Sequence, residues 1–363
     1  MLDPKEAYMQ TAPIQYENKL NILEEAGEYL SYWGKRILIS GGKRALNASL
    51  EKIKLGLKKS DIEYVVTTFT GECSDENINE IATKAKEFQA DIILGVGGGK
   101  AIDSAKVAAE KANCYFAAVP TIAATCAAAS AFSVVYTSEG SFKRDHFLPS
   151  HPVLVMVDPE IIAEAPVKYL KSGIIDGLSK WFEGRAVADG LKDPDLFSQS
   201  AMRLAKLLEE EITERANSAV KSCEINQIND DLMRVINLNI YLTGVIQSLG
   251  QKTCRGAGAH GLHNGMTVMP ESHNVLHGMK VAYGIIVQLF LENKKDEEIN
   301  EVVDFMKNLG ITPSLKGLGL PNEKSILENV AEKAVVDEVM LRMPMKVEIV
   351  DLIEAMKKVE DFV

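Results

Sequence analysis

Hydrophobic and polar positions alternate along the first part of the chain in a way that predicts strands followed by helices. Short β-branched or apolar runs are typical of strands, and several are followed by stretches with apolar residues three or four apart. The expected strands cover residues 36–40, 64–69, 91–96, 115–119 and 153–157. The expected helices carry the stripes Leu46, Leu50, Ile53 and Leu57, then Ile78, Ile81, Ala85 and Phe88, with a third helix from about Lys100. Such alternation predicts an α/β domain with a parallel sheet covered by helices.

The pattern changes after Asp158-Pro159, where strand signals nearly vanish and long amphipathic segments take over. The charge-dense residues 294–301 fit the solvated face of a helix. A length of 363 residues is enough for two domains. We therefore expect an α/β nucleotide-type domain over residues 1–160 and an all-α domain over residues 161–363.

Composition narrows the choice of partners and compartment. The chain carries 40 Lys and Arg against 51 Asp and Glu, a formal charge of −11, and lacks a long basic run, which argues against nucleic acid or an anionic membrane as partner. Residues 1–5 lack the pattern of a secretory signal. The uncharged residues 112–138 contain Pro120 and many small residues, so we interpret them as a buried strand, a loop and a helix start. The five cysteines form no CxxC pair, which is typical of a cytoplasmic protein.

A glycine-rich turn, Gly95-Val96-Gly97-Gly98-Gly99-Lys100, stands where a predicted strand runs into a helix. Backbone N–H groups at such a turn and the following helix N-terminus can bind a pyrophosphate. Lys100 replaces the last glycine of the common dinucleotide fingerprint, and Ala101 stands where a Walker A loop has Ser or Thr. A purely structural turn is the alternative, but three consecutive glycines cost backbone entropy. The sequence thus favours a phosphate-binding turn.

Four of the six histidines lie between residues 260 and 277. His260 and His263 share a helical face, and His273 and His277 follow after Pro270. Imidazole is the commonest ligand of divalent metals in proteins, and catalytic sites use three protein ligands with one open position. Asp176 is a candidate third ligand, because it is a lone acid among apolar and glycine neighbours. The alternative is a set of core histidines that bind backbone carbonyls.

These residues resemble the metal-dependent (iron-containing) alcohol dehydrogenase family, in its glycerol dehydrogenase-like branch. The resemblance rests on motifs that span most of the chain: Gly97-Gly98-Gly99-Lys100 with Asp103, Pro120-Thr121-Ile122-Ala123-Ala124-Thr125, Ser133-Val134-Val135-Tyr136, Asp176 with Lys180-Trp181-Phe182-Glu183, His260-Gly261-Leu262-His263-Asn264-Gly265, and His277-Gly278. It implies the dehydroquinate synthase-like architecture, with a nicotinamide cofactor on the α/β domain and one Zn²⁺ or Fe²⁺ on the helical domain.

The resemblance also implies roles for individual residues. Asp176, His260 and His277 would ligate the metal, and His263 would lie beside the nicotinamide and could relay protons. Lys180 stands where iron-type members carry a fourth ligand, a histidine, which favours zinc over iron. The residues that would face the cofactor are Gly42, Gly98, Gly99, Lys100, Asp103, Thr121, Ala124, Ser130, Phe132 and Tyr136.

Two departures from the family pattern bear on specificity. Cys126 occupies the place of an aspartate that grips the polyol in glycerol dehydrogenases, and the run around it looks like hydroxycarboxylate dehydrogenase members, which reduce 2-oxo acids. Those members also carry an arginine where Arg255 stands; it could pair with a substrate carboxylate or simply lie at the surface. Gly42 replaces the aspartate of NAD-preferring relatives. Lys43 and Arg44 follow it, so we expect NADPH to be used at least as well as NADH, unless both side chains only cap the next helix.

The sequence therefore predicts a cytoplasmic, homo-oligomeric NAD(P)-linked metal enzyme that interconverts an alcohol and a carbonyl, with a 2-hydroxy acid and its 2-oxo acid as the first substrate pair and glycerol as the alternative. A lyase similar to 3-dehydroquinate synthase is a weaker alternative, because the segment around Asp176 supplies Lys180 as its single basic residue. A silent binding protein is disfavoured by the intact glycine turn and ligand positions.

Overall fold

The computed structural model describes residues 10–363, so the expectation for residues 1–5 lies outside the described part. Its contacts divide the chain into two compact units. Unit 1 comprises Met1–Leu170 and Lys221–Val245, and unit 2 comprises Lys171–Val220 and Ile246–Val363. The contacts thus return the later segment Lys221–Val245 to the first unit, whereas the domain limits predicted from the sequence change once, near residue 160.

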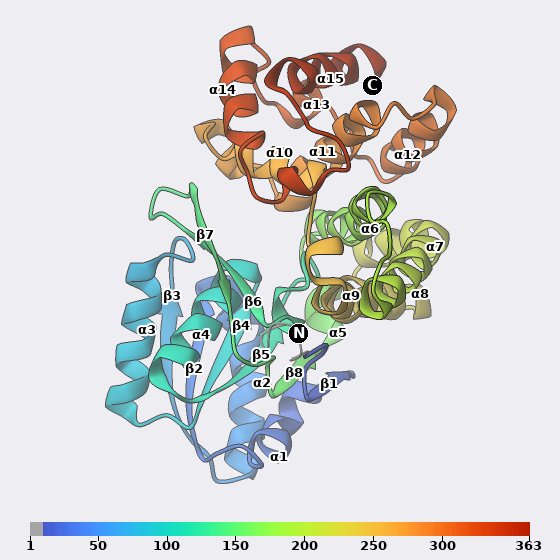
Figure 1. Cartoon of the computed structure of the whole chain (residues 1–363). Coiled ribbons are helices and arrows are strands. Elements are labelled where there is room, and N and C mark those ends of the chain that lie inside the picture. Colours follow the sequence, from blue (N-terminus) through green and yellow to red (C-terminus); the bar gives the residue numbers. More distant parts are fainter. Residues whose placement is uncertain (1–9) are drawn as a thin grey trace. The chain divides into compact units, whose positions relative to one another are not determined.

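Unit 1 is built on a six-stranded parallel sheet with the order β1-β8-β5-β4-β2-β3 (Figure 1). The strands are β1 (Gln15–Asn18), β2 (Arg36–Gly42), β3 (Glu63–Phe69), β4 (Ile92–Gly97), β5 (Tyr115–Pro120) and β8 (Leu154–Val157). The helices between them are α1 (Ala26–Leu30), α2 (Lys43–Lys59), α3 (Asp75–Phe88) and α4 (Gly99–Ala112), with the 3₁₀ turn η1 (Ile22–Glu25) before α1, and α5 (Pro159–Ala163) follows β8. The predicted α/β class is confirmed.

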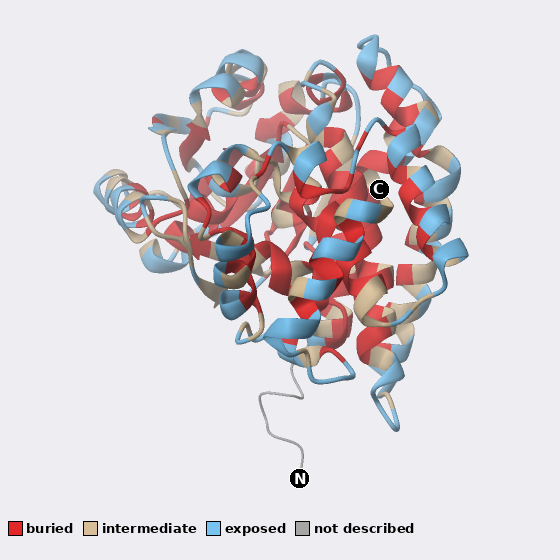
Figure 2. Cartoon of the chain, turned by 90° about the horizontal axis from the view of Figure 1, so that it is seen from above, coloured by how far each residue is buried: buried red, intermediate tan, exposed pale blue. Residues whose placement is uncertain are grey.

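The strands expose alternate residues to two helical layers. Ile37 and Ile39 of β2 pack with α1 and α2 in one core, which also contains Ile53 of α2. On the opposite face Gly95 approaches Ala105 of α4, and α3 packs beside α4. Figure 2 shows the same division along the helices, where buried positions form stripes opposite exposed ones.

Two local predictions in unit 1 are wrong. Gly41 and Gly42 do not form the expected turn, because β2 continues through both and pairs with Thr68 and Phe69 of β3. Residues 112–138 do not lead into a helix. After β5 they form a loop, the short 3₁₀ turn η2 (Ala127–Ala129) and β6 (Phe132–Tyr136), which pairs antiparallel with β7 (Phe142–Phe147).

The segment that returns to unit 1 contains an irregular helix. It consists of α8 (Asp230–Asn237), the π-helical turn η3 (Leu238–Leu242) and the start of α9 (Thr243–Gly250). The π-helical turn places Asn239 in the interior, where its Nδ2 donates to the carbonyl of Ala123 at 3.0 Å. Its side-chain oxygen is buried without a hydrogen-bond partner.

Unit 2 is helical in its described part, as predicted for the later part of the chain. Its longer helices are α6 (Lys168–Asp189), α7 (Leu196–Glu224), α10 (Gly258–Met266), α11 (His277–Leu291), α12 (Asp296–Asn308), α14 (Lys324–Ala334) and α15 (Ile349–Phe362). Short pieces connect them: the 3₁₀ turns η4 (Gln251–Thr253), η5 (Pro270–Asn274) and η6 (Met340–Arg342), and α13 (Leu315–Leu318). The charge-dense residues 294–301 lie largely in α12, which buries Ile299.

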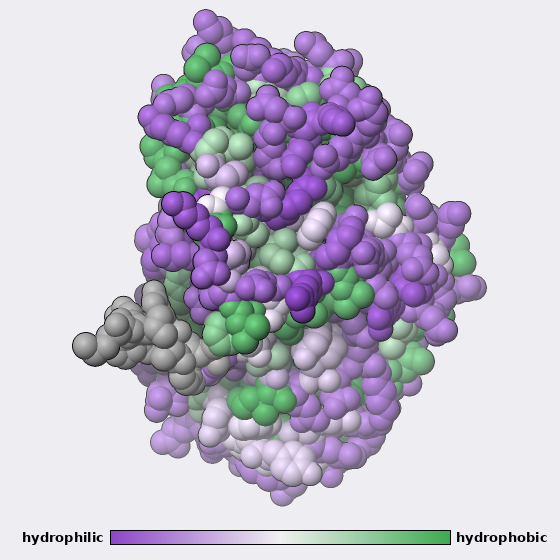
Figure 3. All heavy atoms as spheres, turned by 45° about the vertical axis from the view of Figure 1, so that its right-hand side comes forward, coloured by the Kyte–Doolittle hydropathy of each residue, from purple (hydrophilic) through white to green (hydrophobic). Residues whose placement is uncertain are grey.

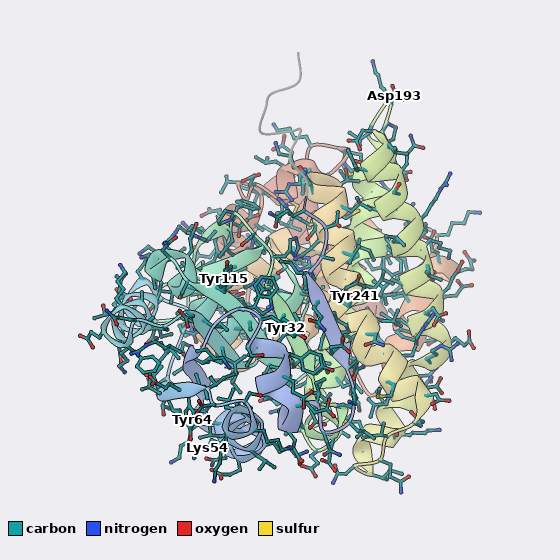
Figure 4. The ribbon with its side chains drawn as sticks, turned by 90° about the horizontal axis from the view of Figure 1, so that it is seen from below. Tyr32, Lys54, Tyr64, Tyr115, Asp193 and Tyr241 are labelled. Carbon is teal, nitrogen blue, oxygen red and sulfur yellow. The ribbon has the colours of Figure 1, made fainter. Side chains whose placement is uncertain are left out.

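The surface agrees with the charged composition. The face drawn in Figure 3 is mainly hydrophilic, and its hydrophobic residues form small separate groups. Among the described helices, none has both the length and the apolar character needed to cross a bilayer. Tyr64 and Tyr115, labelled in Figure 4, lie near the amino ends of β3 and β5, and Tyr115 stacks edge-on against Trp33. These aromatic residues therefore mark the sheet edge opposite the glycine turn.

Candidate metal and cofactor sites

The glycine turn lies at the carboxyl edge of the parallel sheet. β4 ends at Gly97 and α4 begins at Gly99, so the turn connects a central strand directly to a helix N-terminus. Gly97 has φ +146°, a conformation that side chains disfavour. β2, the neighbour of β4, ends beside it at Gly42. This edge is where nucleotides bind in open α/β sheets.

A small hollow adjoins this turn. Of the predicted cofactor residues, Gly98, Gly99 and Ala124 line it, together with parts of the loop that follows β5. Thr121 adjoins the same place, because its backbone N–H donates to the Gly97 carbonyl at 3.1 Å. The structure thus gathers four of the predicted residues around a space next to the helix N-terminus.

The other predicted cofactor residues engage protein groups. Lys100 forms an ion pair of 2.5 Å with Glu72. Asp103 accepts a hydrogen bond from the backbone N–H of Val134 at 3.3 Å. Ser130 is buried, and its hydroxyl donates to the carbonyl of Phe132. Phe132 and Tyr136 begin and end β6, and burial, followed by the charge of Asp103, raises the pKa of the Tyr136 phenol, which stays neutral.

Three predicted ligands meet in unit 2. Asp176 comes from α6, His260 from α10, and His277 is the first residue of α11. Nε2 of His260 lies 3.5 Å from Oδ1 of Asp176, and Nε2 of His277 lies 3.4 Å from the same oxygen. All three ligand atoms lie within 4.8 Å of one another. Ligands around a tetrahedral Zn²⁺ at about 2.0–2.1 Å are separated by about 3.3 Å, so this donor set fits such an ion.

Close helix packing brings these ligands together. Gly278 follows His277, and a Cβ built on it would overlap the carbonyl oxygen of Ser172 on α6. The N–H of Gly278 donates to the Ser172 hydroxyl at 3.0 Å, which fixes the same approach. A glycine at this position therefore lets the start of α11 reach the helix that carries Asp176.

Glu183 is a functional candidate whose role was not predicted from the sequence. It lies on α6 seven residues after Asp176, a spacing that puts both on one helical face. Its Oε2 accepts a hydrogen bond from Nδ1 of His260 at 2.6 Å, and its Oε1 accepts the backbone N–H of His260 at 2.8 Å. The seven-residue spacing between Asp176 and Glu183 was the feature of the sequence that could have indicated this role. The effect of Glu183 is to direct Nε2 of His260 toward Asp176.

His263 contacts the ring nitrogen of His277 that would not ligate the metal, whereas the ring of His273 contacts a backbone carbonyl. Nδ1 of His277 lies 3.0 Å from Nε2 of His263, and Nδ1 of His263 lies 3.1 Å from Oδ1 of Asn264. Burial, and then the charge of Lys280, hold the pKa of His263 well below its ordinary value, so the ring is neutral. His273 binds the carbonyl of Thr267 through Nε2.

The protein groups of the cluster carry opposing charges. Lys180 lies 3.9 Å from Asp176, and both are buried. Burial alone would raise the pKa of Asp176, but Lys180 and hydrogen bonds from His260 and His277 hold it well below the ordinary value. Burial opposes the charge on His260 as well, yet Glu183 and Asp176 raise its pKa to about 9. The cluster therefore stabilises a positive charge among its ligands.

The two predicted substrate residues occupy different units. Cys126 is buried and precedes η2 in unit 1. Arg255 follows η4 in unit 2 and is half-buried, which does not fit a fully exposed surface residue.

Comparison with known proteins gives concordant results. The model of the family "Iron-containing alcohol dehydrogenase" matches residues 13–159. The chain is 36% identical over 338 residues to a glycerol dehydrogenase of Escherichia coli O6:H1, covering 92% of this chain and 91% of the relative. It is 34% identical over 255 residues to hydroxycarboxylate dehydrogenase A of Escherichia coli K12, covering 70% of each. A probable glycerol dehydrogenase structure from Sinorhizobium meliloti superposes with a TM-score of 0.88 at 30% identity, covering 97% of each chain.

Proposed function

Because the chain belongs to the iron-containing alcohol dehydrogenase family, we propose that it is a metal-dependent, NAD(P)-linked oxidoreductase that interconverts a small polyol, glycerol first, with its carbonyl form. The observation that carries the proposal is the cluster of Asp176, His260 and His277, whose ligand atoms converge within 4.8 Å. Glycerol dehydrogenase is the most frequent description among the curated relatives. The 2-oxo acid expected first from the sequence therefore moves to second place.

The chain's own residues prepare the site for this chemistry. Asp176 and the Nε2 atoms of His260 and His277 would hold the ion, for which we propose Zn²⁺, since two imidazoles and one carboxylate are a catalytic zinc set and Lys180 replaces a fourth ligand. A bound ion supplies Lewis-acid polarisation of the substrate oxygen, while the nicotinamide gives or takes the hydride. Glu183 fixes the ring of His260, and His263 orients His277.

The proton relay predicted for His263 stays a proposal. Its contact with Nδ1 of His277 gives it a positioning role. On the other side of the ring, Nδ1 of His263 meets Oδ1 of Asn264, whose Nδ2 donates to Asp337 at 3.1 Å. A carboxamide does not pass protons on, so these contacts support orientation of the ring rather than a relay. We therefore treat positioning as the first role of His263 and test the relay separately.

For the cofactor, we propose that the glycine turn holds the pyrophosphate and that NADPH is used at least as well as NADH. A Cβ on Gly42 would meet nothing within 4 Å, so the space beside the end of β2 is open. Lys43 and Arg44, at the start of α2, are exposed, and the first turn of this helix holds no acid. Basic side chains next to an open space favour a 2′-phosphate over a bare ribose diol.

A 2-hydroxy acid is the second candidate substrate, because two observations favour an anion. Cys126 brings no negative charge to the place where the glycerol enzymes are expected to carry an aspartate. Lys180 is buried and offsets the charges of Asp176 and Glu183, and Lys280, also buried, adds positive charge near His263 and His277. A bound divalent ion would then leave the site positive and attractive to a carboxylate.

The decisive test is an assay of the zinc-loaded protein with glycerol, related diols and 2-hydroxy acids, each with NAD and NADP, and with the matching carbonyl compounds and NADH or NADPH. We expect glycerol oxidation to have the highest kcat/KM. A higher kcat/KM for a 2-oxo acid would establish the second candidate, and absence of all turnover in metal-loaded protein would contradict the enzymatic proposal. Gel filtration in the same buffers tests the expected homo-oligomer.

A further inference from the structure

The predicted cofactor residues Thr121, Ala124 and Ser130 lie on a stretch with little regular structure. Between β5 and β6 it contains η2, a single turn of 3₁₀ helix, and the rest is loop. A loop of this kind does not hold its own shape, because its backbone groups lack ladder partners. Something outside the loop must therefore fix Ala124 and Ser130 relative to the glycine turn, whereas Phe132 already pairs with Phe147 of β7.

Lys106, on α4, contacts this stretch from the interior. Its Nζ donates to the carbonyls of Ala127 at 2.7 Å, Ser130 at 3.0 Å and Phe132 at 2.6 Å. An ammonium group has three N–H donors and no acceptor. The three carbonyls thus account for its whole hydrogen-bonding capacity.

Asp103 supplies the opposite charge on the same helix. Its Oδ1 lies 3.1 Å from Nζ of Lys106, one helical turn away. Its Oδ2 accepts the backbone N–H of Val134, and its own carbonyl accepts from the hydroxyl of Ser133. The pair therefore ties α4 both to the loop and to β6, at carbonyls 127, 130 and 132 and at the amide of 134.

Burial makes this arrangement costly, which argues against an incidental contact. The side chain of Lys106 is 1% exposed, on a helix whose residues 101–109 are all buried. Burying an ammonium is unfavourable until its partners compensate, and a well-packed apolar residue is often no less stable than a buried ion pair. Stability alone therefore does not explain why a lysine stands at this position. The three carbonyls that converge on its Nζ do explain it, because they require three N–H donors.

We propose that Lys106 is a positioning residue of the cofactor site, which fixes the 127–132 loop to the helix that begins at the glycine turn. The inference rests on the proposed nicotinamide binding and adds to it a residue that neither the sequence motifs nor the hollow contains. Lys106 is seven residues, two helical turns, from Gly99. Loop and glycine turn are therefore held by one rigid element, and the bound cofactor finds both already in place.

The test compares Lys106→Met with Lys111→Met in the full-length, zinc-loaded protein. Lys111 lies on the same helix but is exposed and donates to Asn79, so it controls for the loss of a lysine from α4. NADH affinity is measured by the change in its fluorescence on binding, and hydrogen exchange is followed in peptides spanning 127–136. We expect Lys106→Met to weaken NADH binding about tenfold or more and to speed exchange at 127–136. Lys111→Met should leave both unchanged.

Metal content separates positioning from general damage. The ligand cluster lies in unit 2, so Lys106→Met should keep its zinc and raise KM for NADH more than it lowers kcat. If Lys106→Met binds NADH within twofold of Lys111→Met, or leaves exchange at 127–136 unchanged, the inference is overturned.

Lys106→Gln covers the case in which Lys106→Met does not fold. The amide of Lys106→Gln keeps two N–H donors for the carbonyls. We therefore expect Lys106→Gln to bind NADH more weakly than wild type but more tightly than a variant with no donor at this position. Lys106→Arg should restore NADH affinity toward the wild-type value. Wild-type affinity and exchange in Lys106→Gln would contradict the inference. A wild-type protein that binds no nicotinamide would instead contradict the proposed function.

Discussion

Glu183 binds His260 twice, through the ring Nδ1 at 2.6 Å and through the backbone N–H at 2.8 Å. The same carboxylate also accepts the N–H of Ala257 at 2.7 Å. One buried side chain thus orients a ligand's ring and the first turn of the helix that carries it. The orientation of His260 is therefore fixed by Glu183, a residue that would not itself ligate the metal.

Glu183→Gln should weaken zinc affinity about 10- to 100-fold, the usual effect of losing a carboxylate that orients a ligating histidine. The amide preserves size but gives His260 a neutral partner. Competition with a chromogenic chelator measures the change. Glu210→Gln, on an exposed part of α7, is the matched control and should bind zinc like wild type. Equal affinities in all three proteins would show that Glu183 has no such role.

Removal of a ligand should differ from removal of His263. Asp176→Ala and His260→Ala each take away one of the three converging donors, so both bound zinc and turnover should be lost. His263→Ala should retain zinc and lower kcat by about 10²-fold, at the low end for an acid–base group. Elemental analysis paired with kcat measures both. Full zinc occupancy in His260→Ala would refute the ligand assignment.

A relay and a positioning role for His263 can be told apart by the pH dependence of kcat. If His263 only orients His277, His263→Asn, whose Oδ1 can still accept a hydrogen bond from Nδ1–H of His277, should recover most of the lost kcat with an unchanged pH profile. If protons pass through His263, kcat in the same variant should stay low and respond to added imidazole or other small buffers.

The stability of metal-free protein should fall as pH rises from 6.5 to 8. His260 has its pKa raised to about 9, so the folded chain holds a proton that the unfolded chain releases at about 6.5. A raised pKa stabilises the folded state below the unfolded value, and this contribution is lost as pH approaches 9. The pKa values of the buried His263 and the half-buried His277 are lowered, so these two groups affect stability only below this pH window.

Melting temperature in the presence of a chelator measures this effect. Zinc-loaded protein should lack the decline, since a ligating imidazole carries no extra proton. Chelated His260→Gln is the control and should also show a flat profile between pH 6.5 and 8. A decline that persists in His260→Gln would assign it to another group.

Glu72→Gln should strengthen NADH binding. Lys100 is the last residue of the glycine-turn motif, and its Nζ lies 2.5 Å from Glu72, so this carboxylate competes with a phosphate for the ammonium. Removing the carboxylate charge frees the ammonium for the cofactor, so Kd for NADH should fall about two- to fivefold, as expected for a half-exposed ion pair of under 1 kcal/mol. Glu80→Gln removes an exposed ion pair with Lys84 as the control. Weaker NADH binding in Glu72→Gln would reverse the interpretation.

Cys126→Asp should shift specificity toward polyols. A buried carboxylate at this place accepts hydrogen bonds from substrate hydroxyls and repels a substrate carboxylate by several kcal/mol, on the order of the effective-dielectric estimate. The ratio of kcat/KM for glycerol to that for a 2-oxo acid should rise at least tenfold. Cys126→Ser changes polarity without charge and should leave the ratio within a few-fold. An unchanged ratio in Cys126→Asp would place the substrate away from Cys126.

The periodic parts of the sequence predicted their elements well, because a stripe such as Leu46, Ile53 and Leu57 buries one face of α2 against the sheet. Gly41 and Gly42 misled the prediction, since glycine is more often a turn residue and the strand pairing that retains them comes from β3, far along the chain. The β6–β7 hairpin was missed for a related reason: residues 132–136 are short and follow a long run of alanines.

In the candidate metal site, the histidine spacing, the lone acid and the family motifs were enough to predict Asp176, His260 and His277 as a set. The supporting residues were harder to predict, because their roles depend on where backbone groups from other segments converge. Lys106 is one lysine among many on helices, and only the three carbonyls of the 127–132 loop distinguish it. Glu183 was visible as a spacing, but its partner Nδ1 lies 77 residues away in the chain.

The π-helical turn at Leu238–Leu242 gives the α8–α9 region one residue more than an α-helix would need to cover the same rise. Deleting a residue there could restore an unbroken helix and remove an irregularity, so it would be expected to favour helix formation by itself. It would also rotate Asn239 away from the carbonyl of Ala123, to which its Nδ2 donates. Ala123 directly precedes Ala124 in the loop beside the glycine turn. A change of length at this turn would therefore alter the support of a loop that lies far away in the sequence, without changing any residue of that loop.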